Sequence, residues 1–169
     1  GDPCSGDSCF IGGNIATNAG GNRAVKYGTT RHQVYAVEIV NPIGKIVTLG
    51  ARLQKQSTGY CLDQLIIGSE GTLGIITKAT VKLLPKPQHT LDLLAIYDNP
   101  DQAIGTVNKI IKSGIIPTCV EYMDNITIKS VEHYLGETLQ GSDTGCYLIV
   151  EVEGVSEDDL DDKAVTLDE

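Results

Sequence analysis

The second half of the chain alternates between apolar residues spaced as in strands and apolar residues spaced as in helices. Runs rich in β-branched and aromatic residues predict strands at 91–97, 118–123 and 146–153. The segment 125–135 predicts a helix, and the acidic residues of 156–159 predict the start of another, because acidic side chains favour the first helical turn. Strands separated by helices favour a sheet with helices packed on one face.

A further helix start stands out at Asn99-Pro100-Asp101-Gln102. Asn is a preferred N-cap residue, Pro suits the first helical position, and Gln three residues after the cap completes a typical N-terminus. Gly114 is the expected C-cap. The apolar residues between these two points share one helical face, at Ala103, Ile104, Val107, Ile110 and Ile111.

The first half of the chain is rich in glycine and predicts mostly strands and turns. A β-branched run predicts a strand at 34–40, followed by a turn at 41–44 and a return strand at 45–49, which together make a hairpin. Residues 62–67 predict a short helix, and 72–84 predict a long strand.

Two prolines mark the change from the first pattern to the second. Pro85 and Pro87 cannot donate to a strand ladder, so the long strand is expected to end before them. We therefore expect one domain at 1–86 and a second at 87–169.

Composition and charge narrow the classes of partner. The chain of 169 residues has 41% hydrophobic and 21% charged residues, as globular proteins do. Its net charge of −9 argues against nucleic acid or an anionic membrane as a partner, because both require basic surface. No apolar run approaches the roughly 20 residues that span a bilayer, so no membrane span is expected.

The cysteines predict a reducing compartment rather than a disulfide framework. Their number, 5, is odd, and no C-x-x-C pair occurs. We expect reduced thiols, a cytoplasmic location and no metal site. The three histidines are isolated from acidic partners, so none is expected to be catalytic.

Two segments consist almost entirely of small residues. The segment 9–21 has Gly at 12, 13, 20 and 21, and the segment 67–77 has Gly at 68, 71 and 74. Glycine permits positive φ and close approach to a ligand, and successive backbone N–H groups can form an anion-binding concavity. One interpretation is a backbone-lined site for a large, flat ligand that carries phosphates, and the other is two tight turns with close strand packing. Neither segment matches the Rossmann or P-loop spacing.

These two segments, with 23–28 between them and 83–87 after them, resemble the FAD-linked oxidases. This is the flavoprotein superfamily of vanillyl-alcohol oxidase and p-cresol methylhydroxylase (PCMH). The resemblance runs from Asp2 to about Gly154, with the motifs in the same order and spacing. Within the superfamily the chain resembles the glycolate oxidase D subunit, the D-lactate dehydrogenases and the D-2-hydroxyglutarate dehydrogenases.

The resemblance implies an α+β fold and FAD as the cofactor. Residues 1–86 correspond to the second half of a PCMH-type FAD-binding domain, and 87–169 to the start of an α+β cap domain with an antiparallel sheet. Glu70 has two interpretations, as an acceptor for the ribose or as a charge that organises its loop. The residues that match the cofactor-binding segments of the family are Cys9, Phe10, Gly12, Gly13, Thr17, Asn18, Ala19, Gly20, Gly21, Glu70, Gly71, Leu73, Gly74, Ile75 and Ile76.

The implied function is oxidation of a 2-hydroxy acid, of glycolate or D-lactate type, by hydride transfer to flavin. The implied partners are that small-molecule substrate and an electron-transfer subunit. One alternative is another FAD-linked oxidase of the superfamily, either alkylglycerone-phosphate-synthase-like or an alcohol oxidase. The other is a non-catalytic α/β binding module that keeps the fold without the flavin.

Two motifs of the family have no counterpart in this chain. One is the first phosphate loop, Pro-Gly-Gly-Gly-Thr-Ser-like, and the other is the Gly-Asp-Gly-Asn-His-like segment that carries the catalytic and metal-binding histidines. We therefore expect the chain to be an internal part of such an enzyme, with no catalytic residue and no metal ligand of its own. We also expect it to self-associate, because a truncated flavin domain leaves apolar surface and strand edges uncovered.

Overall fold

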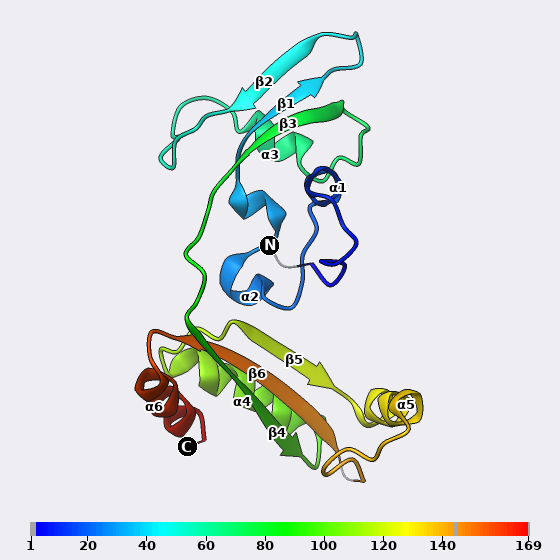
Figure 1. Cartoon of the computed structure of the whole chain (residues 1–169), viewed down its shortest axis with the longest axis vertical. Coiled ribbons are helices and arrows are strands. Elements are labelled where there is room, and N and C mark those ends of the chain that lie inside the picture. The colour runs from blue at the N-terminus through cyan, green and yellow to red at the C-terminus, as the bar shows by residue number, and fades with distance from the viewer. Residues whose placement is uncertain (1–2, 144, 169) are drawn as a thin grey trace. The chain divides into compact units, whose positions relative to one another are not determined.

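The computed structural model describes residues 3–143 and 145–168. The chain divides into two compact units, Gly1–Pro85 and Lys86–Glu169, each with its own three-stranded sheet (Figure 1). The strand order is β2-β1-β3 in the first unit and β4-β6-β5 in the second, and every neighbouring pair in these two sheets is antiparallel.

The sheet of the first unit is built around β1 (Val34–Val40), which coincides with the predicted strand. It pairs with β2 (Ile46–Gly50) through the predicted hairpin, whose turn is closed when Asn41 Oδ1 accepts hydrogen bonds from the amides of Ile43 and Lys45. The third strand, β3 (Ile75–Val81), is shorter than the predicted 72–84, because the chain still turns at Thr72, whose amide donates to Ser69 O.

Four short helices complete the first unit. They are α1 (Ile11–Thr17), α2 (Ala24–Tyr27), the 3₁₀ helix η1 (Thr30–Gln33) and α3 (Leu62–Ile66), of which only α3 was expected from the sequence. No helix was expected within 9–21, for which one interpretation was a tight turn, yet Ile11–Thr17 is helical. This segment is helical because Ile15, which is fully buried, packs into the core beneath the sheet. That core contains Ile15, Val34, Val37, Ile39, Ile66 and Ile67.

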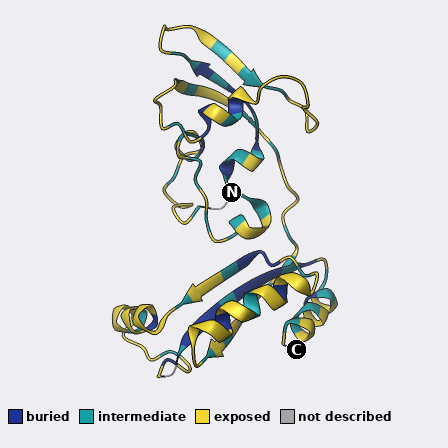
Figure 2. Ribbon diagram, turned by 180° about the vertical axis from the view of Figure 1, so that it is seen from behind, coloured by how far each residue is buried: buried dark blue, intermediate teal, exposed yellow. Residues whose placement is uncertain are grey.

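The second unit has the predicted order of strands and helices. Its central strand β6 is largely buried (Figure 2), and its residues Leu148, Val150 and Val152 pack against Ile110 and Leu160 from two helices. In chain order the elements are β4 (His89–Tyr97), α4 (Pro100–Lys112), β5 (Cys119–Met123), α5 (Asn125–Leu135), β6 (Cys146–Gly154) and α6 (Glu157–Asp168).

The helix ends of this unit follow the predicted signals. Asn99 caps α4 by accepting a hydrogen bond from the Gln102 amide at 3.1 Å. The C-cap of α4 is Ser113, one residue before the expected Gly114, which follows it with φ of +85°. Gly136 caps α5 as predicted, in a left-handed conformation.

A half-buried carboxylate, that of Glu132, fixes α5 to the loop that follows it. The Glu132 side chain is 13% exposed and accepts hydrogen bonds from the Leu139 amide at 2.7 Å and from Lys129 Nζ at 3.0 Å. Hydrogen bonds from the Ser142 hydroxyl, the Leu139 amide and the Lys129 ammonium lower the pKa of Glu132 to about 2. The carboxylate is therefore ionised at neutral pH.

We predict that Glu132→Gln destabilises the protein in a pH-dependent way. Because the pKa of Glu132 is lower in the folded state, its stabilising contribution is fully present above the ordinary value of 4.5 and is lost as the pH falls towards about 2. Urea unfolding should show a constant difference between wild type and variant above pH 5, and a shrinking difference below it. Glu137→Gln, at an exposed position in the same loop, is the control. An equal difference for both variants would contradict the prediction.

Candidate cofactor site

The first turn of α1 presents two glycines whose hydrogen atoms face open space. Gly12 and Gly13 are exposed, and a Cβ atom added at either position has nothing within 4 Å. A helical Gly costs about 0.5–1 kcal/mol relative to Ala. The packing of the described residues therefore gives no reason for glycine here, whereas close approach of a ligand to the helix would.

The residues before α1 add an apolar ring and a half-buried thiol. Phe10 is the N-cap residue; its side chain is 84% exposed and it makes no side-chain cap hydrogen bond. Cys9 is half-buried, and its sulfur accepts a hydrogen bond from Asn14 Nδ2 at 3.2 Å. Phe10 can therefore contact a ligand directly, while Cys9 is oriented by the helix.

The other end of α1 turns sharply. Thr17 Oγ1 donates to Gly13 O at 3.0 Å, and Asn18 ends the helix in a left-handed conformation with φ of +53°. Ala19 O then accepts two hydrogen bonds from Thr30, one from its amide at 3.0 Å and one from its hydroxyl at 2.8 Å.

The chain continues from this turn through two more glycines. A Cβ atom at Gly20 would lie 3.4 Å from Thr29 Cγ2, which is a tight contact, and Gly21 O accepts a hydrogen bond from the Ala24 amide at the start of α2. These two glycines therefore serve the path of the chain between α1 and η1.

The second small-residue segment lies directly beside the first. The Gly68 amide donates to Ile15 O at 3.0 Å, and the Glu70 amide donates to Ala16 O at 2.9 Å. Glu70 has φ of +51°, and its side chain is exposed. The fold thus brings together the two segments that the sequence singled out separately, through main-chain hydrogen bonds.

The rest of this segment has both exposed and buried members. Gly71 is exposed, and Leu73 and Ile75 expose 41% and 62% of their surfaces. Gly74 is buried, and Ile76 packs against the core of the first unit. Only the exposed members of the segment are accessible to a ligand in the described structure.

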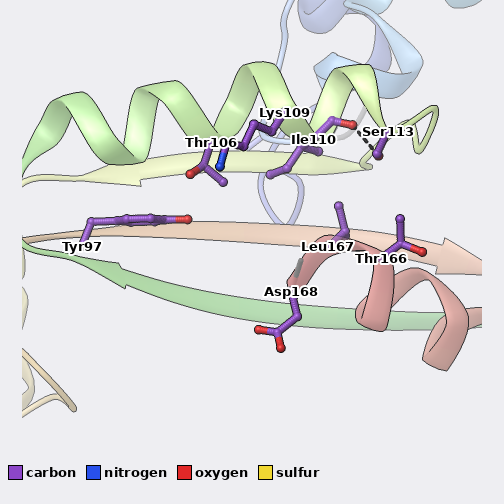
Figure 3. Close-up of a pocket in the computed structure, with 8 residues that line it drawn as sticks. All are labelled: Tyr97, Thr106, Lys109, Ile110, Ser113, Thr166, Leu167 and Asp168. Atoms are coloured by element: carbon purple, nitrogen blue, oxygen red, sulfur yellow. Dashed lines mark hydrogen bonds between the residues drawn. The ribbon is translucent and has the colours of Figure 1, made fainter.

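The second unit contains a hollow of about 230 Å³ between α4 and α6 (Figure 3). It holds none of the residues that the sequence predicted for the site. Polar and apolar side chains of α4 and α6 meet there with Tyr97 of β4, and the Ser113 hydroxyl is already bonded to Ile110 O at 2.7 Å. The glycine-rich surface of the first unit is therefore the better candidate.

Residues 3–143 and 145–168 contain neither a candidate membrane span nor a candidate metal site. No helix there is long and apolar enough to cross a membrane, and no group of three or more His, Cys, Asp or Glu side chains is arranged to hold a metal ion.

The chain matches two protein families in succession. Residues 1–50 match the FAD binding domain family, and residues 86–169 match the C-terminal domain of the FAD linked oxidases. The chain belongs to the FAD-linked oxidases. Its cofactor is FAD, and the expected α+β, PCMH-type fold class is confirmed.

Relatives of the chain include proteins named D-lactate dehydrogenase and glycolate oxidase subunit. The chain is 45% identical over 157 residues to a D-lactate dehydrogenase of Anaerostipes hadrus, a match that covers 90% of this chain and 33% of the relative. It is 48% identical over 133 residues to glycolate oxidase subunit GlcD of Bacillus subtilis, covering 79% of this chain and 28% of the relative. The chain thus spans about a third of the length of the curated relatives it matches.

Solved structures show the same fold. The chain superposes on an alkyldihydroxyacetonephosphate synthase with a TM-score of 0.73 and 26% identity, over 98% of this chain and 32% of the synthase. The FAD binding domain match ends at residue 50, before the second small-residue segment. That segment is linked to the candidate site by its hydrogen bonds to Ile15 and Ala16.

The sequence did not identify two residues that hold these segments in place, of which Arg31 alone connects one segment to the other. Thr30, in η1, donates to Ala19 O in the first segment. Arg31, the next residue, donates to Asn18 Oδ1 in the first segment and to Ile67 O in the second. No periodicity or motif marks them, because their partners are distant in sequence.

We predict that Gly74→Ala destabilises the first unit and that Gly13→Ala does not. A Cβ atom at Gly74 would lie 2.9 Å from Val40 O and 3.1 Å from Ile39 Cδ1, so β1 and β3 must separate, which costs about 1–3 kcal/mol. Gly13 has open space around it. Urea unfolding of both variants measures the difference, and equal stability would show that Gly74 is not required for the packing of β3 on β1.

Proposed function

We propose that this chain is part of an FAD-dependent oxidoreductase that oxidises a 2-hydroxy acid of glycolate or D-lactate type. In this proposal residues 1–86 form the second half of the FAD-binding domain, and 87–169 form the start of the cap domain. The support comes from relatives named for those two activities, at 45% and 48% identity.

The residues present fit the cofactor in one specific respect. FAD is long and flat and carries a diphosphate, so it can lie against main chain only where side chains do not intrude. The exposed faces of Gly12 and Gly13 provide such a surface, and no packing requirement of the described residues accounts for it. This open surface is the observation that carries the proposal.

The positions of six of the predicted residues suggest a role for each. Gly12 and Gly13 would hold the cofactor through main-chain contact, and Phe10 and Leu73 would shield it from water with exposed apolar side chains. When bound, FAD supplies the hydride acceptor. The buried members Gly74 and Ile76 would act indirectly, by setting the position of the strand behind the site.

The other FAD-linked oxidases are the second candidate. The synthase of the structural comparison shares 26% identity with this chain, well below the 45% and 48% of the hydroxy-acid relatives. The non-catalytic binding module leaves the open faces of Gly12 and Gly13 unexplained.

Partners and location follow as parts of the same proposal. The GlcD relative is named as a subunit of glycolate oxidase, which supports an electron-transfer subunit as a partner here. The odd number of cysteines, 5, supports reduced thiols and with them a cytoplasmic location.

The direct test of the proposed function is the visible spectrum of the enzyme at the full length of its relatives. The protein should purify with flavin bands that bleach under anaerobic conditions when glycolate or D-lactate is added. The L-lactate isomer, added at the same concentration, is the control for stereospecific reduction. Bands that persist with both substrates would contradict the hydroxy-acid assignment, and a protein that stays colourless after FAD is supplied would contradict the flavoprotein assignment.

We predict further that Gly12→Ala weakens FAD binding without weakening the fold. The added methyl group meets no protein atom, so stability should rise by about 0.5–1 kcal/mol, as expected for Gly to Ala in a helix. The same methyl group would stand between the helix and the cofactor. Fluorescence titration with FAD measures the loss of affinity.

Gly105→Ala is the matched control for this variant. Gly105 lies within α4, and a Cβ atom there also has nothing within 4 Å. It should gain similar stability and keep the wild-type affinity for FAD. Unchanged affinity in Gly12→Ala would remove the first turn of α1 from the cofactor site.

A further inference from the structure

Arg31 donates hydrogen bonds to both small-residue segments. Its backbone amide donates to Asn18 Oδ1 at 3.0 Å, which fixes the residue that ends α1. Its guanidinium Nη2 donates to Ile67 O at 3.2 Å, at the start of the second segment. A single residue of η1 therefore bridges the two segments.

The space around this bridge is filled closely. A Cβ atom at Gly68 would lie 3.1 Å from Asn18 Cβ and 3.4 Å from Arg31 Nη2, so only glycine fits without displacing one of them. The Gly68 amide on the other side is bonded to Ile15 O. The turn at Gly68 is thus confined between α1 and the guanidinium.

The charge of Arg31 serves no ion pair within the described part of the chain. The residue is half-buried, and within the described residues its guanidinium donates a hydrogen bond to a main-chain carbonyl. A hydrogen bond from a charged donor stabilises more than one from a neutral donor. The hydrogen bond from the Arg31 guanidinium to Ile67 O is therefore suited to hold two main-chain segments together.

We propose that Arg31 is a positioning residue for the cofactor site. By binding Ile67 O and Asn18 together, it holds the turn at Gly68–Glu70 against the end of α1 before any cofactor arrives. The exposed surfaces of Gly12–Gly13 and of Gly71–Leu73 then keep a fixed spacing, so binding does not have to order them. This inference rests on the proposed function, because it assumes that these surfaces face FAD.

The test combines an exchange measurement without cofactor and a binding measurement with it. The variants are Arg31→Ala, Arg31→Lys and, as the control, Arg52→Ala at an exposed position of the same unit, all in the enzyme at the full length of its relatives. Hydrogen exchange of the Gly68 and Glu70 amides in the FAD-free protein reports whether the two segments stay together. Fluorescence titration gives the dissociation constant for FAD.

In Arg31→Ala, loss of one charge-assisted hydrogen bond should raise the exchange rate of the Gly68 and Glu70 amides and the dissociation constant for FAD, each about tenfold. Arg31→Lys keeps a charged donor of shorter reach, so its exchange rate and its dissociation constant should lie between those of Arg31→Ala and the wild type. If Arg31→Ala does not fold, Arg31→Lys provides the test. Arg52→Ala should match the wild type. The positioning role is supported if the affinity for FAD falls as the exchange rate of the Gly68 and Glu70 amides rises across these variants.

Two results would overturn the proposal. Weaker FAD binding with unchanged exchange at Gly68 and Glu70 would mean that the guanidinium binds the cofactor directly. Faster exchange with unchanged affinity would mean that the spacing of the two segments does not matter for binding. Failure of the wild type to bind FAD would overturn the proposed function, and the exchange rates would then still show whether Arg31 joins the segments.

Discussion

Two main-chain hydrogen bonds, from Gly68 to Ile15 and from Glu70 to Ala16, determine the layout of the first unit. Ile15 is anchored in the core by its side chain and receives the second segment through its carbonyl. One residue therefore joins the hydrophobic interior to the exposed glycine surface. The position of that surface depends on core packing on one side and on the Gly68–Glu70 turn on the other.

The glycines of this unit divide into two groups with different physical reasons. Gly68 and Gly74 are required by the fold, because neighbouring protein atoms occupy the space of a side chain. Gly12 and Gly13 have no such neighbours among the described residues. In the sequence the two kinds of glycine look alike, and the structure separates those that packing requires from those whose surface stays open.

The elements that the sequence predicted well are those with local causes. The strand at 34–40, the Asn99 cap and the helix at 125–135 depend on side chains within a few residues of each other. Helix α1 escaped prediction because its glycines oppose helix formation and the burial of Ile15 offsets them. The bridge through Arg31 escaped for a related reason, since its partners lie at distant points of the chain. The assignment of individual residues to FAD came from the family resemblance and remains a prediction.

The central claim is that FAD lies against α1 and the turn that is bonded to it. Hydrogen exchange of the full-length enzyme, with and without FAD, tests it most directly. The account predicts that FAD slows exchange at residues 11–18 and 67–74, with no change in α6 at the far end of the second unit's sequence. If FAD leaves the exchange rates of residues 11–18 unchanged, the central claim is contradicted.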